Sequence, residues 1–534
     1  MGSPNIANHF ANIYSELYSK GEPSDKFEKL CESINSDIEQ DDIEQVNRIN
    51  EDIVKSALNK MKDGKSDVLF DFTSDLLTHG PPELIGHIVN MFRGFVTHGS
   101  VPFFLLICTL VPIVKDGLGN HATSDNYRAI AISSLILKLF DWCVLLLEGH
   151  KLDCHELQFG FQAGTSTSIC SWALNSVIDY YNSAGSPVYS CTMDLSKAFD
   201  CVDFWQLFQK LRNKGINPIF LRTLAYIYSK QYCDVRWKDS YSYRFPISRG
   251  CRQGAISSPL FFNIYVNILI LQLEQSGIGC KIGNKYSGIF VYCDDIFLLS
   301  ASRPGLQAMV TKCEKWAKSH SMKFSTNIDV NKSKTKCIIF SKKKSDRQNV
   351  DKIMLNNTPL PFVESCNHLG MNLHCDNQLD TDCDIKRSKF VGKVHSLTQE
   401  LYFASSDVLL NLLNVYCTSF FGSNCWNLFS NNCDRFYKAW NVSCRMIFKI
   451  SNLTHRYLIE SLTDYIHPKV IMCSRFIKFN DSLSNCKKSL LRQLSNLNKF
   501  NQRTVYGKNL QKIARLCNLK VEDLNSNIVK SEMK

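Results

Sequence analysis

The sequence lacks an apolar run long enough to cross a membrane. Its longest such run, residues 101–114, is interrupted by Pro102 and Pro112, whereas a transmembrane helix needs about 20 consecutive apolar residues. The first ten residues, MGSPNIANHF, also lack the basic start and the apolar core of a secretory signal. We therefore expect a protein without a signal peptide and without a membrane-spanning segment.

Disulfide and metal-binding cysteine patterns are missing as well. The 23 cysteines are scattered through apolar stretches without regular spacing, and no pair of CxxC elements and no Cys/His set with metal-ligand spacing occurs. The pattern predicts reduced, mostly buried thiols. The sequence contains no internal repeat and no low-complexity tract either, which excludes solenoid and fibrous proteins.

What the chain does contain is the composition of an ordinary globular protein. With 534 residues, 44% of them hydrophobic and 21% charged, it is long enough for two or three domains. The formal net charge of +12 suits a polyanionic partner such as nucleic acid, although many basic proteins bind none.

Short β-rich runs alternate with helical stretches in the middle of the chain, which favours an α+β fold. The first 60 residues carry helical spacing, and residues 101–114 are predicted to form a buried strand. A basic linker at residues 342–350 is followed by a helical, aromatic region. Strands are predicted at residues 188–193, 288–292, 296–299 and 337–340, and helices at residues 204–213, 259–275 and 310–320.

The sharpest chemical feature is a pair of adjacent carboxylates, Asp294 and Asp295, between two apolar strands. Two like charges so close together repel each other unless a cation lies between them. Asp is also a common turn residue, so the pair alone indicates little. However, a third carboxylate, Asp194, ends the apolar strand at residues 188–193. Together the three would offer oxygen ligands for two Mg²⁺ ions, provided that the fold brings positions 194 and 294 together.

Three strings then match a family in order and spacing: MDLSKAFDCVD, SRGCRQGAISSPLFFNIYVN and YCDD. In this register they resemble the reverse transcriptases of non-LTR (LINE-type) retrotransposons. The resemblance covers about residues 55–460. It extends to residues 111–115 and 126–130, which are similar to fingers motifs, and to residues 331–340, 367–370 and 421–426 downstream.

The resemblance implies a right-hand polymerase with fingers, a palm that contains an antiparallel sheet, and a helical thumb. It also implies an RNA-directed DNA polymerase that extends a DNA primer on an RNA template with deoxynucleoside triphosphates, using two Mg²⁺ ions for which Mn²⁺ could substitute. We expect a helical N-terminal extension at residues 1–60, fingers and palm at 61–345, a helical thumb and post-thumb region at 346–460, and a basic helical tail at 461–534.

Carried over residue by residue, the resemblance implies that Asp194, Asp294 and Asp295 hold the metal ions, with Asp194 and Asp294 bridging both. Lys334 is similar to the family lysine that protonates the leaving pyrophosphate. Because residues 328–330 look inserted, Lys332 and Lys336 remain alternatives for this role.

The resemblance also implies a nucleotide site. Lys115 and Arg128 would reach the triphosphate, and Phe199 would exclude a 2′-hydroxyl from the sugar position. Gln253 and Gly254 resemble the loop along the nucleotide and template, where glycine allows a close backbone approach. For Arg252 two interpretations stay open: contact with template phosphate, or a solvated side chain.

Two departures from the family pattern stand out. Cys293 occupies a position where the family usually has Ala, and a small residue of either kind is expected to fit. Complete elements of this kind usually encode an endonuclease before the polymerase, so we expect the polymerase region alone. A family member of this kind would act in the nucleus and cytoplasm.

Three alternatives remain open at this point. One is a catalytically silent, truncated copy that binds nucleic acid without turnover. The others are an intron-encoded maturase and a viral RNA polymerase. The C-terminal aromatics would either stack on bases or form the thumb core, while the oligomeric state and the role of the last sixty or so residues stay open.

Overall fold

The computed structural model describes residues 2–533 except 20–23, 68–71, 328, 330–332, 349, 377–378 and 464–465. The chain folds into two compact units that share it in alternating segments. Unit 1 comprises Met1–His155, Leu195–Leu271 and Glu314–Phe324, and unit 2 comprises Glu156–Asp194, Gln272–Cys313 and Ser325–Lys534.

Unit 1 is built on a five-stranded sheet in the order β2-β1-β4-β5, with β6 also paired to β4. The first two strands form an antiparallel hairpin, whereas β1 and β4 run parallel. Residues 107–114 form a nearly continuous apolar run, and the first four residues of β1 are all buried in the unit. The strands are β1 (Ile107–Val114), β2 (Tyr127–Ser133), β4 (Tyr232–Trp237), β5 (Ser240–Tyr241) and β6 (Phe245–Pro246).

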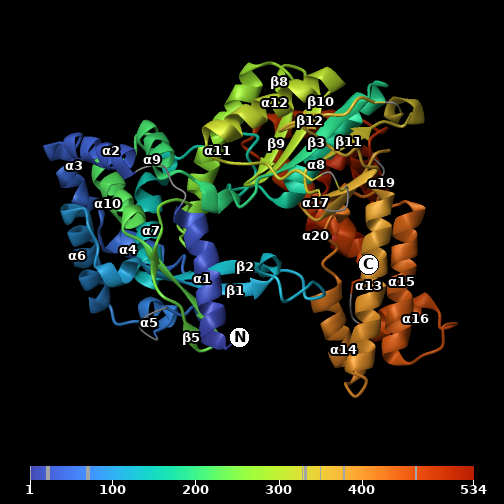
Figure 1. The fold of residues 1–534 in the computed structure, drawn as a ribbon. Helices are drawn as coiled ribbons and strands as arrows, with labels where there is room; N and C mark the ends of the chain where they lie inside the picture. Colours follow the sequence, from blue (N-terminus) through green and yellow to red (C-terminus); the bar gives the residue numbers. More distant parts are fainter. Residues whose placement is uncertain are drawn as a thin grey trace. The chain divides into compact units, whose positions relative to one another are not determined.

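Unit 1 also contains a group of helices that pack on one another, and α1 packs against the sheet (Figure 1). The N-terminal helix α1 packs beside β4 and β5, where the Phe10 ring contacts Tyr127 and Trp237 with centroid distances of 5.2 and 5.5 Å. The helices are α1 (Ser3–Ser19), α2 (Ser24–Ser36), α3 (Gln40–Glu44), α4 (Glu51–Leu58), α5 (Ser74–Thr78), α6 (Glu83–His98), α7 (Leu135–Glu148), α9 (Phe204–Asn213) and α10 (Pro218–Ser229).

Unit 2 contains a four-stranded antiparallel sheet in the order β11-β3-β10-β9. Helix α8 (Thr167–Ser183) lies against it, in contact with β3 and β9 (Figure 1). Of its two inner strands, β10 is buried from Ile296 to Ser300 and β3 buries Val188, Ser190, Cys191 and Met193, which restrains their register. The strands are β3 (Val188–Asp194), β9 (Ile289–Tyr292), β10 (Asp295–Ser300) and β11 (Lys336–Phe340).

Three two-stranded sheets and a helical region complete unit 2, and two further helices contribute residues to both units. The hairpins are β7 (Lys281–Ile282) with β8 (Lys285–Tyr286), β12 (Met354–Leu355) with β13 (Thr358–Pro359), and β14 (Ser365–His368) with β15 (Met371–His374). The shared helices are α11 (Ser258–Gln275) and α12 (Arg303–Ser319). The helical region comprises α13 (Asp380–Glu400), α14 (Ser406–Leu412), α15 (Asn431–Phe448), α16 (Arg456–Thr463), α17 (Pro468–Ser484), α18 (Ser489–Lys499), α19 (Val505–Leu516) and α20 (Ser526–Glu532).

The α+β class with an antiparallel sheet is confirmed, and the central strands form where the apolar runs predict them. Three local predictions were wrong. Residues 103–106 form a 3₁₀ helix, so the first strand begins at Ile107 rather than at residue 101. Helix α12 begins at Arg303 because the Ser302 hydroxyl accepts a hydrogen bond from the Gly305 amide at its start. The expected helical region from residue 346 begins instead with β12–β15, because paired left-handed residues turn each hairpin.

The predicted state of the cysteines is confirmed: all 23 are free thiols, and most of them are buried. Among the described residues, no helix combines the length and the apolarity that a membrane crossing requires.

Candidate active site

The aspartate-bearing ends of two strands, β3 and β10, lie side by side in the four-stranded sheet of unit 2. In the antiparallel register of β10 and β3, Asp295 lies directly opposite Asp194, and on its other side Asp295 pairs with Tyr292 of β9. Asp294 lies in the turn that joins β9 to β10. We call residues 292–295 the acidic turn. Opposed residues in such a ladder have Cβ atoms about 4.5–5.5 Å apart, so the fold brings positions 194 and 295 together, a hundred residues apart in sequence.

Electrostatics at the acidic turn favour a bound cation. Partial removal from water, followed by the charges of Asp294 and Asp194, raises the pKa of Asp295 to about 6. Burial likewise raises the pKa of Asp194, although the Lys334 ammonium opposes this shift. Because like charges raise the free energy of the ionised cluster, a divalent cation at this end of the sheet would be stabilised by the same charges.

Lys334 lies beside this cluster. Its Nζ is 3.6 Å from Asp194 Oδ2, and the side chain is 71% exposed. The next residue, Thr335, is buried, and its hydroxyl accepts a hydrogen bond of 3.3 Å from the Asp194 amide. Of the three candidate lysines, Lys334 therefore has a carboxylate neighbour, Lys336 lies on β11, and Lys332 lies outside the described residues.

A cavity of about 550 Å³ opens beside the acidic turn within unit 2. Residues of strands β3, β10 and β11 line it, together with residues 366–370 of β14 and the turn that follows this strand. That turn contains Leu369 and Gly370, both with positive φ, at 48° and 77°. The cavity thus combines the carboxylates Asp194 and Asp295 with the cations Lys334 and Lys336, which suits a phosphate-bearing ligand with its metal ions.

His368 of β14 lines the same cavity and gives a testable pH effect. Burial lowers its pKa to about 4, and its ring packs edge-on against Phe297 at 4.8 Å. Because the unfolded chain takes up the proton near pH 6.5, folding stability linked to this residue is present above that pH and is lost as the pH falls toward 4. We expect the change in unfolding free energy between pH 7.5 and pH 5 to shrink by about 2 kcal/mol in His368→Leu. Urea titrations at both pH values measure the unfolding free energy. An equal change with pH in the wild-type protein and in His368→Leu would contradict the prediction.

The residues predicted to bind nucleotide all lie in unit 1. Lys115 and Arg128 are exposed and belong to the β1–β2 hairpin, where Arg128 pairs with Ile113 in the register. The Lys115 ammonium donates to the Asp125 carbonyl at 2.7 Å, across the loop that joins the two strands. The hairpin therefore carries both cations on adjacent backbone segments.

Phe199 and Gln253 have defined partners in unit 1. The Phe199 ring stacks on Phe262 of α11, with centroids 4.5 Å apart. The Gln253 amide donates to the Asp200 carboxylate and, at 2.8 Å, to the Tyr18 hydroxyl. The Tyr18 hydroxyl itself donates to Asp200 at 2.9 Å. Helix α1 thereby orients the predicted nucleotide-site glutamine, a link that nothing in the sequence around Tyr18 indicates.

Gly254 lies close to strand β2 and has a left-handed φ of 77°. A Cβ atom here would lie 2.8 Å from the Ala131 carbonyl oxygen. The predicted need for glycine is therefore matched by a close backbone approach, although the neighbouring backbone is that of β2.

Both interpretations of Arg252 were wrong. The side chain is buried and forms an ion pair with the equally buried Asp141 of α7. The same Asp141 oxygen accepts a hydrogen bond of 3.1 Å from the Ile256 amide. Sequence could not reveal this pairing, because the partner lies more than a hundred residues away in a helix that otherwise looks apolar.

The C-terminal aromatics of unit 2 form a core rather than a stacking surface. Trp426, Tyr437 and Trp440 are buried, and Phe436 contacts the rings of Phe390, Phe420 and Trp426. Tyr416, by contrast, is 63% exposed. The buried members of this set therefore belong to a core, and the assignment of that core to a thumb stays a prediction.

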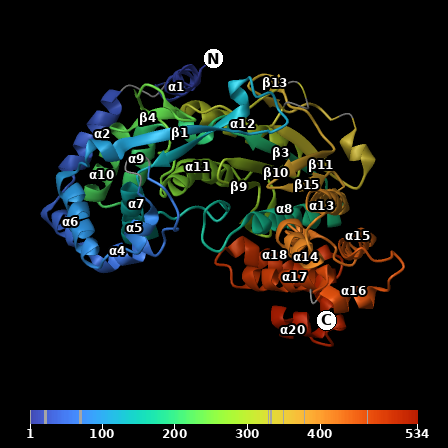
Figure 2. The ribbon, with the colours of Figure 1, turned by 90° about the horizontal axis from the view of Figure 1, so that it is seen from below.

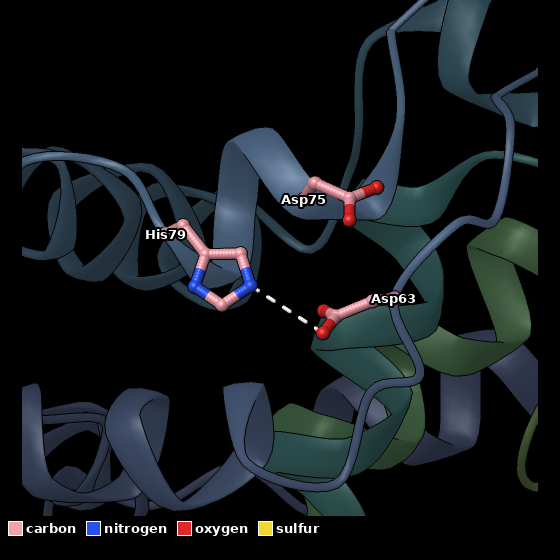
Figure 3. Close-up of side chains that lie close together, drawn as sticks. All are labelled: Asp63, Asp75 and His79. Carbon is pink, nitrogen blue, oxygen red and sulfur yellow. Dashed lines mark hydrogen bonds and ion pairs between the residues drawn. The ribbon is translucent and has the colours of Figure 1, made fainter.

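A second group of possible metal ligands lies in unit 1 around Asp63, Asp75 and His79 (Figure 3). Among the described residues, it is the one group of three or more His, Cys, Asp or Glu side chains whose possible metal-ligating atoms all lie within 4.8 Å of one another. Its members already have local partners, since Asp75 accepts from the Gly64 amide at 3.0 Å and Asp63 contacts His79 at 3.3 Å. These contacts tie the loop after Asp63 to helix α5, which accounts for the cluster structurally.

Comparison with known proteins gives one family match. Residues 113–373 match the family described as "Reverse transcriptase (RNA-dependent DNA polymerase)". This stretch includes the acidic turn, Asp194, Lys334, the predicted nucleotide residues and all but the last residue of the β14–β15 hairpin.

Curated relatives come from retrotransposable elements. The chain is 23% identical over 214 residues to the Pol polyprotein of the type-2 retrotransposable element R2DM of Drosophila melanogaster, covering 40% of this chain and 20% of that protein. It is 26% identical over 232 residues to the Pol polyprotein of the type-1 retrotransposable element R2 of Nasonia vitripennis, covering 42% of this chain and 22% of that protein. The matched stretch thus spans about a fifth of the length of these relatives.

Among solved structures, a telomerase from Candida albicans in complex with a fragment of telomeric RNA is similar at 11% identity. The similarity covers 82% of this chain and 68% of that chain, with a TM-score of 0.39.

Proposed function

The chain belongs to the reverse transcriptase (RNA-dependent DNA polymerase) family, of the kind found in non-LTR (LINE-type) retrotransposons, and on this premise we propose that it extends a DNA primer on an RNA template. The observation that supports this most directly is the register that sets Asp194 opposite Asp295, with Asp294 in the turn beside them. These are the three carboxylates to which the resemblance assigns the metal ions.

The donor set of the acidic turn fits divalent metal ions. Carboxylate oxygens are the ligands that Mg²⁺ prefers, and the raised pKa of Asp295 reflects burial together with the neighbouring carboxylates. Two ions, typically about 3.5–4 Å apart, do not require all three carboxylates to converge on one point. We propose that Asp194, Asp294 and Asp295 hold two Mg²⁺ ions, for which Mn²⁺ can substitute. When bound, such ions activate the primer 3′-hydroxyl and neutralise charge on the leaving pyrophosphate.

The other residues that the resemblance singles out have complementary roles in this proposal. Lys334, 3.6 Å from Asp194, donates a proton to the leaving pyrophosphate. Lys115 and Arg128, both exposed on the β1–β2 hairpin, bind the triphosphate of the incoming nucleotide. Gln253, oriented by Tyr18 and Asp200, and Gly254 contact the nucleotide and template.

Phe199 is proposed to select deoxynucleotides. Its ring cannot swing freely because it stacks on Phe262 at 4.5 Å, so it would meet a 2′-hydroxyl as a fixed obstacle. We expect Phe199→Val to reduce the preference for dTTP over UTP by about 10- to 100-fold, measured as the ratio of kcat/KM values. Phe103→Val, at a residue 53% exposed in the same unit, serves as the control. An unchanged ratio in Phe199→Val would remove this role.

A primer-extension assay tests the proposed activity. The purified chain is incubated with poly(A)–oligo(dT), Mg²⁺ and either dTTP or UTP, and we expect incorporation of dTTP alone. Incorporation of UTP by the unaltered protein would point to an RNA polymerase. Tight binding of the primer–template without incorporation would instead support a catalytically silent nucleic-acid-binding copy.

A further inference from the structure

A buried glutamine holds the backbone of the acidic turn. Gln158 is fully buried, and its Oε1 accepts hydrogen bonds from the amides of Cys293 at 3.0 Å and Gly160 at 2.9 Å. Cys293 has a left-handed φ of 61°, a conformation that a residue with a side chain adopts only when its surroundings maintain it. The Gln158 amide is therefore one of the groups that keep Asp294 and Asp295 at their positions.

The segment that carries Gln158 runs alongside β9. The Phe159 amide donates to the Val291 carbonyl at 2.7 Å, and the Val291 amide donates to the Leu157 carbonyl at 3.0 Å. The Phe159 ring also stacks on Phe290 at 5.9 Å. A Cβ atom at Gly160 would lie 2.6 Å from the Cys293 nitrogen, so the two backbones are in direct contact. Any displacement of this segment would be transmitted to the acidic turn.

The start of helix α18 also contacts the segment that carries Gln158. The Glu156 carboxylate accepts hydrogen bonds from the Ser489 amide at 2.9 Å and from the Leu490 amide at 3.3 Å. These are amides that the first turn of a helix leaves without intrahelical partners, and they favour an anion. In return, the Lys488 ammonium donates to the carbonyls of Glu156 at 2.7 Å and Gln158 at 3.0 Å, and it lies 5.0 Å from the centre of the Phe159 ring.

Helix α18 is itself anchored within unit 2. It contacts α8, which packs against the sheet of the acidic turn (Figure 2). Trp172 of α8 contacts Phe479 of α17 at 6.0 Å and Tyr506 of α19 at 5.3 Å. The C-terminal helices thus form a packed support on which the Lys488–Glu156 contact is fixed.

We propose that the C-terminal region supports the acidic turn through Lys488 and that Gln158 is a positioning residue for its carboxylates. The proposal rests on the proposed metal site, because its consequence is the geometry of the metal ligands. A turn that loses its hydrogen-bonded support samples more conformations, and carboxylates with less fixed positions bind metal more weakly. The last sixty or so residues, whose role the sequence left open, thereby gain a role in supporting the acidic turn.

The test measures metal binding separately from activity. Mn²⁺ is titrated into the purified full chain and followed by electron paramagnetic resonance, with Asp294→Asn used to identify the sites that belong to the acidic turn. We expect Lys488→Met and Gln158→Met to weaken Mn²⁺ binding at those sites by about tenfold or more. Lys488→Arg, which retains a donor over the Phe159 ring, should restore most of the affinity.

Lys512→Met is the matched control, because Lys512 lies over the Phe429 ring at 4.9 Å elsewhere among the C-terminal helices. In the polymerase assay, Lys488→Met should lower kcat and raise the Mg²⁺ requirement while leaving the KM for primer–template unchanged. Wild-type Mn²⁺ affinity in Lys488→Met, or the same loss in Lys512→Met, would overturn the proposal. If the wild-type chain incorporates no nucleotide, the Mn²⁺ titration still shows whether Lys488 supports the metal ligands. Failure of the proposed polymerase activity is therefore distinguishable from failure of the positioning role.

Discussion

Asp294→Asn is expected to lower the rate of dTTP incorporation by about a thousandfold or more. The substitution keeps the size of the side chain and the shape of the turn, but it removes one negative charge from the three carboxylates. Metal ions supply several kcal/mol of transition-state stabilisation, and each ~1.36 kcal/mol corresponds to a tenfold change in rate. Single-turnover primer extension at saturating nucleotide and Mg²⁺ measures the effect on the chemical step.

The same experiment has clear controls. Asp194→Asn should behave like Asp294→Asn, since Asp194 lies on the neighbouring strand at the same end of the sheet. Asp523→Asn, at an exposed residue of the C-terminal region, should leave the rate unchanged. Retention of more than a tenth of the wild-type rate in Asp294→Asn would mean that the acidic turn is not the catalytic centre. Circular dichroism would verify that each variant remains folded.

Asp141→Leu is expected to destabilise the protein by about 3–5 kcal/mol, because it leaves the Arg252 guanidinium buried without its partner. Both side chains of this ion pair are almost fully removed from water. A loss of this size is a large fraction of the ~5–15 kcal/mol that stabilises a typical folded protein. Urea unfolding at pH 7.5 measures it, followed by fluorescence of the tryptophans.

A double variant separates the buried charge from the packing. Asp141→Leu combined with Arg252→Met replaces the pair by apolar side chains and should recover much of the lost stability. Lys318→Gln breaks an exposed pair with Glu314 and should change the unfolding free energy by less than about 1 kcal/mol. A single Asp141→Leu variant as stable as Lys318→Gln would show that Arg252 reaches water or another anion.

Local structure was largely predictable where the sequence carries a strong periodic pattern. Helix α9 spans the predicted residues 204–213, and its N-terminus is set by the Asp203 carboxylate, which accepts from the Gln206 amide at 2.8 Å. The apolar arms of the acidic turn likewise form β9 and β10. In these elements the side chains within one segment are enough to determine its conformation.

Predictions failed where the conformation depends on a turn or on a distant partner. Residues 354–374 form hairpins because Asn356 and Asn357, and then Leu369 and Gly370, adopt positive φ, and the helical composition further along the chain concealed these turns. Arg252 was expected to be accessible to solvent or template, but it is buried because it pairs with the distant Asp141. Tyr18 and Gln158 gave no signal, because their long-range partners, Asp200 for Tyr18 and Cys293 for Gln158, lie more than a hundred positions away along the chain.

The sequence by itself therefore indicated the resemblance to reverse transcriptases, the α+β class and three candidate metal ligands, because these depend on residue types and spacing along the chain. Only the tertiary structure decided that Asp194 lies opposite Asp295, that Lys334 lies 3.6 Å from Asp194, and that Gln158 and Lys488 contact the backbone around the turn. Such pairings arise from strand register and from packing between distant segments. Their free energy comes from burial and hydrogen bonds that exist only once the chain has folded.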